Sequence, residues 1–284
     1  MTKHITCLTF DFDGVSSWSV NGQATPTMLS RGEFGGVGAL RVLDLLKERG
    51  IKSTWFIPGV TIETYPEICE RVVAEGHEVG HHGWSHVPPA KFTREEEAEE
   101  LAKGNAAIRR LTGQKARGYR SPSWDLSPHS VELLLAEGFI YDSSMMGDDY
   151  TPYYARQGDV IHRDGRVEFG APSALLEMPI SWSTDDFPHF EYLRSKSGGL
   201  PGLRASSAVL ENWLGDFEYM RRFDWGILTY TCHPLCIGRG HRMLMLEKLI
   251  DGLAAGKAEF LTVEEAVAEY KCRKKGAGSS LKAS

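Results

Sequence analysis

The alternation of short β-type segments with longer helical segments narrows the possible folds of this chain more than any other feature of its sequence. Apolar periodicity and helix-ending residues predict helices at residues 37–49, 62–75, 93–111, 127–138, 206–222, 240–255 and 262–271. Shorter segments predict strands at residues 4–10, 52–57, 77–80, 115–119, 139–141 and 225–232. Repeated strand–helix units are typical of a mainly parallel β-sheet covered by helices.

The number of these units bears on whether the sheet is open or closed. Roughly seven strand–helix units favour an α/β fold, a distorted (β/α) barrel with about seven parallel strands. An open dinucleotide-binding sheet is disfavoured because no G-x-G-x-x-G motif follows the first strand. Because no linker is visible, we expect one domain over residues 1–271, with an irregular stretch at 145–205 and a flexible tail at 272–284.

Charge and the N-terminal sequence limit the partners and the location. The formal net charge is −6 and no basic stripe is present, which argues against nucleic acid and membrane surfaces and leaves a small-molecule substrate. No segment approaches ~18 consecutive apolar residues. The N-terminal sequence MTKHITCLTFDFDG lacks the pattern of a secretory signal, and the five cysteines are too sparse for a disulfide framework. We therefore expect a cytoplasmic protein.

Ionisable residues recur where the predicted strands end. In a parallel barrel the carboxyl ends of the strands meet on one face, and that face carries the functional groups. A single aspartate after a strand is more commonly a turn former, but scattered surface charge would not fall at one strand end after another. The residues concerned are Asp11, Asp13, His82, His86, Arg120, Asp142 and His233.

Residues 77–86, HEVGHHGWSH, contain a pair of histidines that suits a metal. His82 and His86 are four residues apart and can face the same way on one helical turn. An H-x3-H pair alone is a weak signal, but Asp13 completes a set of two imidazoles and one carboxylate that leaves positions open for water and substrate. Asp11, two positions before Asp13, points the same way on an extended backbone. We expect Zn²⁺, although these ligands also accept Co²⁺, Ni²⁺ or Mn²⁺.

Taken together, these motifs resemble those of the polysaccharide deacetylase superfamily (carbohydrate esterase family 4). TFDFDG resembles its first motif, TFDDG, and HGWSH matches its H-[ST]-x-x-H motif with Gly83 in the Ser/Thr position. RSPSW matches R-x-P-x-[WY], DSS resembles a looser fourth motif, and LTYTCH resembles the last. The resemblance runs in order from about residue 4 to 270.

One difference from the common first motif points to a subgroup of this superfamily. Phe12 separates two acidic residues that are adjacent in the common motif. FDFDG, LSRGEFGG (29–36) and PISWSTDDFPHF (179–190) look like a cytoplasmic subgroup that includes cyclic imide hydrolases, allantoinase-like enzymes and proteins named peptidoglycan deacetylases. This subgroup implies a homo-oligomer, with a tetramer as one form.

The resemblance also implies a role for each strand-end residue in a metal-dependent hydrolase of carbon–nitrogen bonds. Asp11 would act as general base and His233 as general acid. Arg120 would orient Asp11, and Asp142 would pair with His233 and raise its pKa.

Substrate contacts are expected from four further residues. Trp124 and Trp182 would form pocket walls. Arg31 and Glu33 would lie near the site in a loop.

Three functions remain open at this point. The first is hydrolysis of a small cyclic imide or ureide, favoured by the N-terminal sequence and by an aromatic segment at 182–192 that could roof the site. The second is deacetylation of N-acetyl sugars or peptidoglycan. The third, an inactive binding protein, is disfavoured because the set of strand-end residues is complete. The sequence does not decide the exact substrate, the metal or the oligomeric state.

Overall fold

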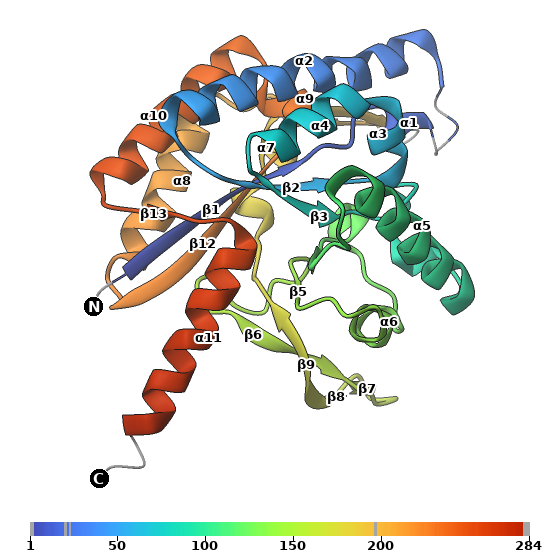
Figure 1. Ribbon diagram of the computed structural model, residues 1–284, viewed down its shortest axis with the longest axis vertical. Coiled ribbons are helices and arrows are strands. Elements are labelled where there is room, and N and C mark those ends of the chain that lie inside the picture. The colour runs from blue at the N-terminus through green and yellow to red at the C-terminus, as the bar shows by residue number, and fades with distance from the viewer. Residues whose placement is uncertain (1–2, 20–21, 23, 196–197, 281–284) are drawn as a thin grey trace.

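A curled, mostly parallel β-sheet organises the chain in the computed structural model, which describes residues 3–19, 22, 24–195 and 198–280 (Figure 1). The strands of this sheet are β1 (Lys3–Asp11), β2 (Thr54–Ile57), β3 (Glu78–His81), β4 (Gly118–Tyr119), β5 (Tyr141–Asp142), β6 (Tyr153–Gln157), β9 (Ala171–Glu177), β12 (Trp225–Cys232) and β13 (Glu259–Phe260).

The order of these strands is β12–β1–β2–β3–β4–β5–β9–β6, and β13 also pairs with β1. Every pair from β12 to β9 is parallel, whereas β6 runs antiparallel to β9. The predicted α/β fold with about seven parallel strands is therefore confirmed. Because β12 and β6 are the two ends of the order, the sheet is a half-barrel.

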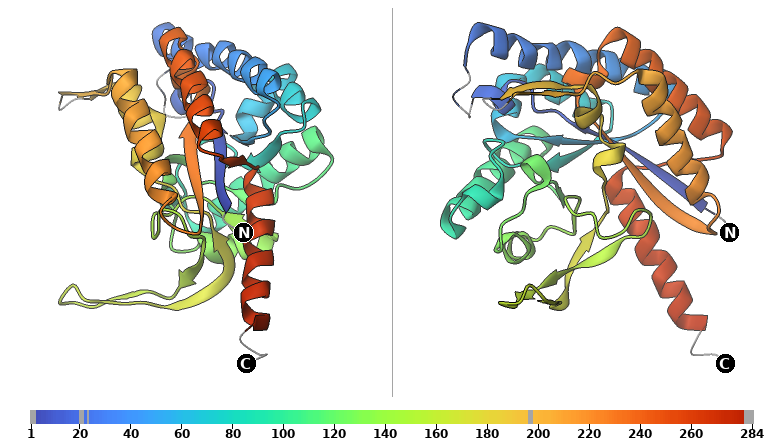
Figure 2. Two further views of the ribbon diagram at one scale, coloured as in Figure 1. Left: turned by 90° about the vertical axis from the view of Figure 1, so that its left-hand side faces the viewer. Right: turned by 180° about the vertical axis from the view of Figure 1, so that it is seen from behind.

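Helices cover the outer side of the sheet. The last helix, α11, projects away from the rest of the molecule toward the C-terminus (Figures 1 and 2). The helices are α1 (Ser16–Ser19), α2 (Pro26–Arg49), α3 (Gly59–Thr64), α4 (Pro66–Ala74), α5 (Arg94–Thr112), α6 (Ser130–Glu137), α7 (Asp186–Phe190), α8 (Ser206–Met220), α9 (Pro234–Ile237), α10 (Gly240–Ala255) and α11 (Val263–Ser280). Short 3₁₀ turns are η1 (Pro89–Lys91), η2 (Pro122–Trp124) and η3 (Trp182–Thr184).

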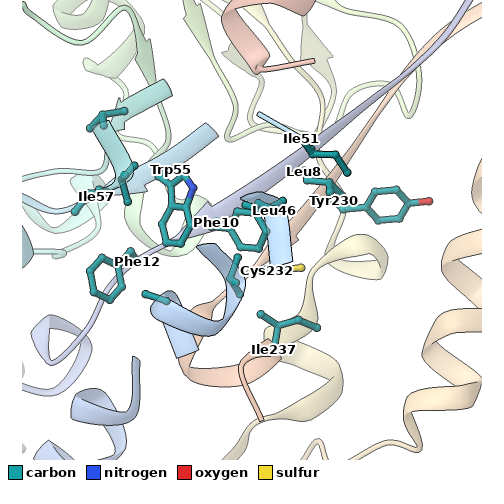
Figure 3. Close-up of a cluster of buried hydrophobic side chains, with 14 of the residues drawn as sticks. Leu8, Phe10, Phe12, Leu46, Ile51, Trp55, Ile57, Tyr230, Cys232 and Ile237 are labelled. Atoms are coloured by element: carbon teal, nitrogen blue, oxygen red, sulfur yellow. The ribbon is translucent and has the colours of Figure 1, made fainter. Parts of the chain in front are cut away.

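The main hydrophobic core lies between the sheet and these helices, and Figure 3 shows part of it. Phe10 and Phe12 are fully buried there, with ring centroids 5.0 and 6.2 Å from that of Trp55. Side chains alternate along an extended chain, so Asp11 and Asp13 point away from these rings. The phenylalanine between the two acids therefore places both carboxylates on the same side, where they line a pocket.

Helix α2 runs through residues 29–36, which were expected to form a loop. Thr25 caps the helix by accepting a hydrogen bond from the Met28 backbone nitrogen, and Pro26 occupies its first turn. Glycines make this stretch resemble a loop in the sequence. In the structure the absence of a Cβ at Gly32 instead lets this stretch of α2 approach the backbone of Gly14 and Val15, and Gly38, further along the helix, allows the same approach to the Pro234 backbone.

Replacing Gly38 with alanine is expected to lower the free energy of unfolding by about 1–3 kcal/mol, the usual effect of overpacking. An added Cβ would lie 1.9 Å from the backbone oxygen of Pro234, which cannot rotate away. Gly215→Ala in α8 is the matched control, because no atom lies within 4 Å of its added Cβ. It should raise stability by up to about 1 kcal/mol. Urea unfolding of both variants is the measurement, and equal effects would contradict this packing.

Three other stretches differ from the sequence-based predictions. The helix expected at 62–75 is divided into α3 and α4, because Pro66 begins a new helix. Part of the irregular stretch at 145–205 forms an antiparallel arm, in which β7 (Val160–Ile161) and β8 (Val167–Glu168) extend beyond β6 and β9 (Figure 2). Helix α11 continues to Ser280 through most of the expected tail, and residues 281–284 lie outside the described residues.

No helix within the described ranges has the length and apolar character needed to cross a membrane.

Candidate active site

The carboxyl ends of β1, β3 and β12 border one pocket of about 400 Å³. Its wall contains Asp11 and Asp13 from the end of β1, His82 and His86 after β3, and His233 after β12. Parallel pairing of the strands brings these residues together from distant parts of the sequence, at the face where barrels of this type carry their functional groups.

Asp13, His82 and His86 form a candidate metal group. Oδ1 of Asp13 lies 3.5 Å from Nε2 of His82 and 3.3 Å from Nε2 of His86. This oxygen is buried and has no hydrogen-bond partner among the described residues. Nδ1 of His82 lies 2.7 Å from the backbone oxygen of Arg120 and donates to it, which leaves Nε2 as a lone-pair donor for a cation.

The charge states of these three residues also suit a cation. Burial lowers the pKa of His82 and of His86 to about 4, so both imidazoles are neutral near pH 7, the form that binds metal. Burial raises the pKa of Asp13, because its charge has no fully compensating partner. A divalent cation would supply that compensation, so the donor set fits a divalent metal.

The turn that carries His86 is held by the neighbouring helix α5. Gly83 and His86 both have left-handed backbone conformations, with φ of 72° and 61°. Glu100 accepts hydrogen bonds from the backbone nitrogens of Trp84 (3.2 Å) and Ser85 (2.9 Å) and from the Ser85 hydroxyl (2.7 Å). Glu100 was not identified from the sequence, because it belongs to a run of glutamates that resembles an ordinary exposed helix face.

Asp11 and Arg120 form a buried ion pair beside the metal group. Nη1 of Arg120 donates to Oδ1 of Asp11 at 2.8 Å, and both side chains are almost inaccessible to solvent. Burial alone would raise the pKa of Asp11, but the positive charges of Arg120 and His233, together with the Arg120 hydrogen bond, outweigh it and hold this pKa below its usual value. Asp11 is therefore ionised and able to accept a proton.

His233 is paired with two aspartates that precede and begin α7. Its Nδ1 lies 2.8 Å from Oδ1 of Asp186 and 3.4 Å from Oδ1 of Asp185, and its backbone nitrogen also donates to Asp186 at 2.9 Å. Burial opposes protonation of His233, but the charges of Asp185 and Asp186 raise its pKa well above the usual value. A parallel bridge between Asp185 and Thr231 fixes this segment beside β12.

The expected pairing of Asp142 with His233 is wrong. Asp142 ends β5, which is separated from β12 by four strands in the sheet order. Its Oδ1 instead accepts a hydrogen bond from the Ser144 hydroxyl at 2.7 Å. The adjacent acids of the segment STDDFPHF are the signal that could have identified Asp186 in the sequence.

Tryptophans form much of the pocket wall. The rings of Trp124 and Trp182 are stacked with centroids 4.1 Å apart, and both line the pocket. Trp18 and Phe187 also line it, and neither was identified from the sequence. The signal for Phe187 is its place beside the two acids that hold His233.

Arg31 and Glu33, expected near the substrate, do not line the pocket. Both lie on helix α2 rather than in a loop. Arg31 forms an ion pair with Glu191, and its guanidinium carbon lies 5.4 Å from the ring centroid of Trp18. Glu33 is exposed. Arg31 therefore supports a pocket wall from behind.

The sequence was compared with known families and proteins. The profile of the family described as Polysaccharide deacetylase matches residues 37–139. A peptidoglycan deacetylase of Helicobacter pylori is 37% identical over 255 residues, which cover 85% of this chain and 87% of the relative. The chain belongs to the polysaccharide deacetylase family.

Other polysaccharide deacetylase relatives and structures agree with this assignment. A peptidoglycan deacetylase-like protein of Gibberella zeae is 30% identical, with 92% of this chain and 84% of the relative covered. A crystal structure of a putative polysaccharide deacetylase from Mycobacterium smegmatis is 28% identical, with a TM-score of 0.84 and coverage of 96% and 92%. An allantoinase structure has a TM-score of 0.75 at 19% identity, with 94% of this chain and 89% of that chain covered, and shares the fold.

Family membership sets the general chemistry. Polysaccharide deacetylases are hydrolases that act on carbon–nitrogen bonds other than peptide bonds, and they generally depend on a metal. The part of the chain that matches the family profile includes His82, His86, Arg120 and Trp124. The group of Asp13, His82 and His86 is the candidate metal site of this member of the polysaccharide deacetylase family.

Asp186→Asn is expected to move the alkaline limb of the kcat–pH profile to lower pH by about one unit or more. The protonated form of His233 is lost as the pH rises through its raised pKa, and removing the Asp186 charge lowers that pKa. Asp142→Asn is the control. It should leave the alkaline limb in place, whereas a shift in this variant and none in Asp186→Asn would restore the pairing expected from the sequence.

Proposed function

We propose that this chain removes acetyl groups from N-acetylated sugars by metal-dependent hydrolysis of the amide bond. The proposal rests on one observation above all. Asp11 is held ionised by Arg120, while His233 in the same pocket is held protonated by its aspartates. One group can accept a proton and the other can donate one at the same pH, as general acid–base catalysis requires.

The choice of an acetylated sugar is supported by the relatives. The two that match most of this chain are named as a peptidoglycan deacetylase and a peptidoglycan deacetylase-like protein. Those names favour removal of an acetyl group over opening of a cyclic imide or ureide ring, the function that the sequence alone favoured.

Different residues of this chain would carry out different steps of the reaction. A divalent metal held by Asp13, His82 and His86 would polarise the amide carbonyl and acidify water. Asp11 accepts a proton from the attacking water as general base. Nδ1 of His233 is bonded to Asp186, so Nε2 is the atom that donates a proton to the leaving nitrogen. The carbon–nitrogen bond breaks, and the products are acetate and a free amine.

Trp124 and Trp182 would bind the substrate ring. Stacked aromatic rings offer a flat apolar surface, and such surfaces contribute much of the binding energy in small pockets. Trp124 is buried, whereas Trp182 remains 44% exposed and can contact a substrate at the rim.

A small cyclic imide or ureide is the second candidate substrate. The size of the pocket, about 400 Å³, and its tryptophan wall favour this candidate. Such a ring contains the same bond between a carbonyl carbon and nitrogen, so the same base and acid would serve.

A panel of substrates assayed on the zinc-loaded protein tests the proposal. N-acetylglucosamine oligomers and peptidoglycan fragments should release acetate, and succinimide, hydantoin and allantoin should remain closed. The Asp11→Asn protein is the control for adventitious activity. Ring opening without acetate release would replace the deacetylase proposal with the second candidate.

A further inference from the structure

Two carboxyl groups outside the pocket face each other in the interior of the protein. Asp142 on β5 and Glu177 on β9 are partners in the parallel register of these strands. Both are 0% exposed. The two side chains are within hydrogen-bonding reach of each other. A pair of acids buried in this way requires compensation, because burying an unpaired charge is unfavourable.

Each carboxyl group has one oxygen with donors and one without. Oδ1 of Asp142 accepts from the Ser144 hydroxyl at 2.7 Å. Oε1 of Glu177 accepts from the backbone nitrogens of Ser144 and Met145, both at 2.9 Å. Oδ2 of Asp142 and Oε2 of Glu177 have no hydrogen-bond partner among the described residues. Two ionised groups would supply four acceptors and no donor between them, whereas a single proton gives each unpaired oxygen a partner.

Among the residues that the structure describes, the cation that acts on Asp142 is Arg120, and it is engaged elsewhere. Its guanidinium nitrogens are bonded to Thr9, Asp11 and Ser143. The other titratable groups that interact with the pair are the phenols of Tyr119 on β4 and Tyr153 on β6, whose pKa values are raised by burial. Both phenols are neutral at pH 7.

Burial acts on both acids in the same direction. It raises the pKa of Asp142 and that of Glu177, and the charge of Asp142 also raises the pKa of Glu177. Like charges that share a site cannot both ionise near neutral pH.

We propose that Asp142 and Glu177 share one proton and act as positioning residues for Arg120. The contacts form a continuous path. Ser144, held by both acids, accepts a hydrogen bond from the Ser121 backbone nitrogen at 2.8 Å, next to Arg120. Ser143 binds the Arg120 guanidinium through its backbone oxygen at 3.0 Å and its hydroxyl at 2.9 Å.

Arg120 in turn holds Asp11. The effect on catalysis rests on the proposed function, in which Asp11 is the general base, whereas the shared proton does not depend on it.

The pH dependence of unfolding measures the shared proton directly. Both acids lose their protons above pH ~4.3 in the unfolded chain, while the folded pair keeps one. The contribution of this pair to wild-type stability should therefore fall as the pH rises, until the pH passes the raised pKa of the pair, whereas buried histidines with lowered pKa values contribute in the opposite direction and equally in the variants. Each extra proton held by the folded state changes the unfolding constant by about tenfold per pH unit.

In the Glu177→Gln variant, the side-chain amide supplies a hydrogen-bond donor that replaces the proton shared by Asp142 and Glu177. Its amide oxygen can accept from Ser144 and Met145, and its nitrogen can donate to Asp142. Urea unfolding gives the free energy of unfolding at each pH from 5 to 8. Its slope against pH should be more positive in Glu177→Gln than in the wild type by the amount expected for about one proton. Glu97→Gln is the matched control and should keep the wild-type slope, because Glu97 is buried but accepts from the hydroxyls of Ser127 and Ser130. Parallel slopes for the wild type and Glu177→Gln would overturn the inference.

The positioning role has a separate readout. Ser144→Ala removes the hydroxyl that joins the acid pair to the strand end of Arg120. We expect kcat to fall about 10-fold or more, as for other small displacements of catalytic groups. KM should change by less than about twofold, because neither Ser144 nor Glu177 lines the pocket. Glu177→Ala should act in the same way, and Glu177→Gln should restore kcat to within about threefold of the wild type.

Metal content should be the same in all of these proteins. An unchanged kcat in Ser144→Ala would overturn the positioning role. Absence of deacetylation by the wild type would instead reject the proposed function, and the unfolding slopes would still decide whether the proton is shared.

Discussion

Asp11→Asn is expected to lower kcat by about 10²- to 10⁴-fold, the range expected for loss of a general base. Asparagine has the same shape as aspartate, and its oxygen can still accept the Arg120 hydrogen bond that now joins Nη1 to Oδ1 at 2.8 Å. Its amide group cannot take a proton from water. The metal should stay, because the candidate ligands are Asp13, His82 and His86. Acetate release gives kcat, and elemental analysis gives the metal content.

The control for this experiment is Asp125→Asn. Asp125 is an exposed carboxylate that follows Trp124 and does not line the pocket. Its replacement should change kcat by less than about twofold, since exposed charges are strongly screened. If Asp11→Asn retained its metal and full turnover, Asp11 would not be the base. If it lost the metal, its role would be that of a ligand.

His86→Ala is expected to lose the metal and, with it, deacetylase activity. His86 would contribute one of the three candidate donor atoms, with Nε2 3.3 Å from Oδ1 of Asp13. Affinity should fall by more than about 100-fold, because even residues that only hydrogen-bond to a ligand commonly contribute 10- to 100-fold. Dialysis against zinc followed by elemental analysis measures the loss. His241→Ala, at an exposed histidine, is the control and should bind metal as the wild type does.

Much of the fold follows from local patterns in the sequence. The strand at 225–232 and the helix at 240–255 coincide with β12 and α10. Thr93 and Glu96 form a capping box at the start of α5 through reciprocal hydrogen bonds. These elements are encoded by short-range signals, namely apolar runs and capping residues, which do not depend on the rest of the chain.

Tertiary contacts decide the parts that were predicted incorrectly. The glycines at 32–36 suggest a loop, but Gly32 is needed where the helix packs against the backbone of Gly14 and Val15. The β6–β9 arm is formed by pairing within a stretch that is rich in turn residues. Strand pairing depends on partners that are distant in sequence, so local propensity does not reveal it.

The candidate site was likewise predicted in part from the sequence, and the rest depends on tertiary contacts. The rule that functional groups follow strand ends placed Asp11, Asp13 and His82 in one pocket. It could not distinguish Asp142 from Asp186 as the partner of His233, because it does not specify which segments lie beside β12. The bridge between Asp185 and Thr231 supplies that information, and it exists only in the folded chain.

Titration of metal-stripped protein with zinc, monitored by acetate release from N-acetylglucosamine oligomers, is the most direct test of the central claim. The claim is that Asp13, His82 and His86 hold one metal that the reaction requires. Activity should be absent at the start, rise in proportion to added zinc and level off at about one equivalent per chain, the stoichiometry of a single site with three protein ligands. His86→Ala should show no rise over the same range. Full acetate release by the stripped protein, or equal restoration of His86→Ala, would contradict the account.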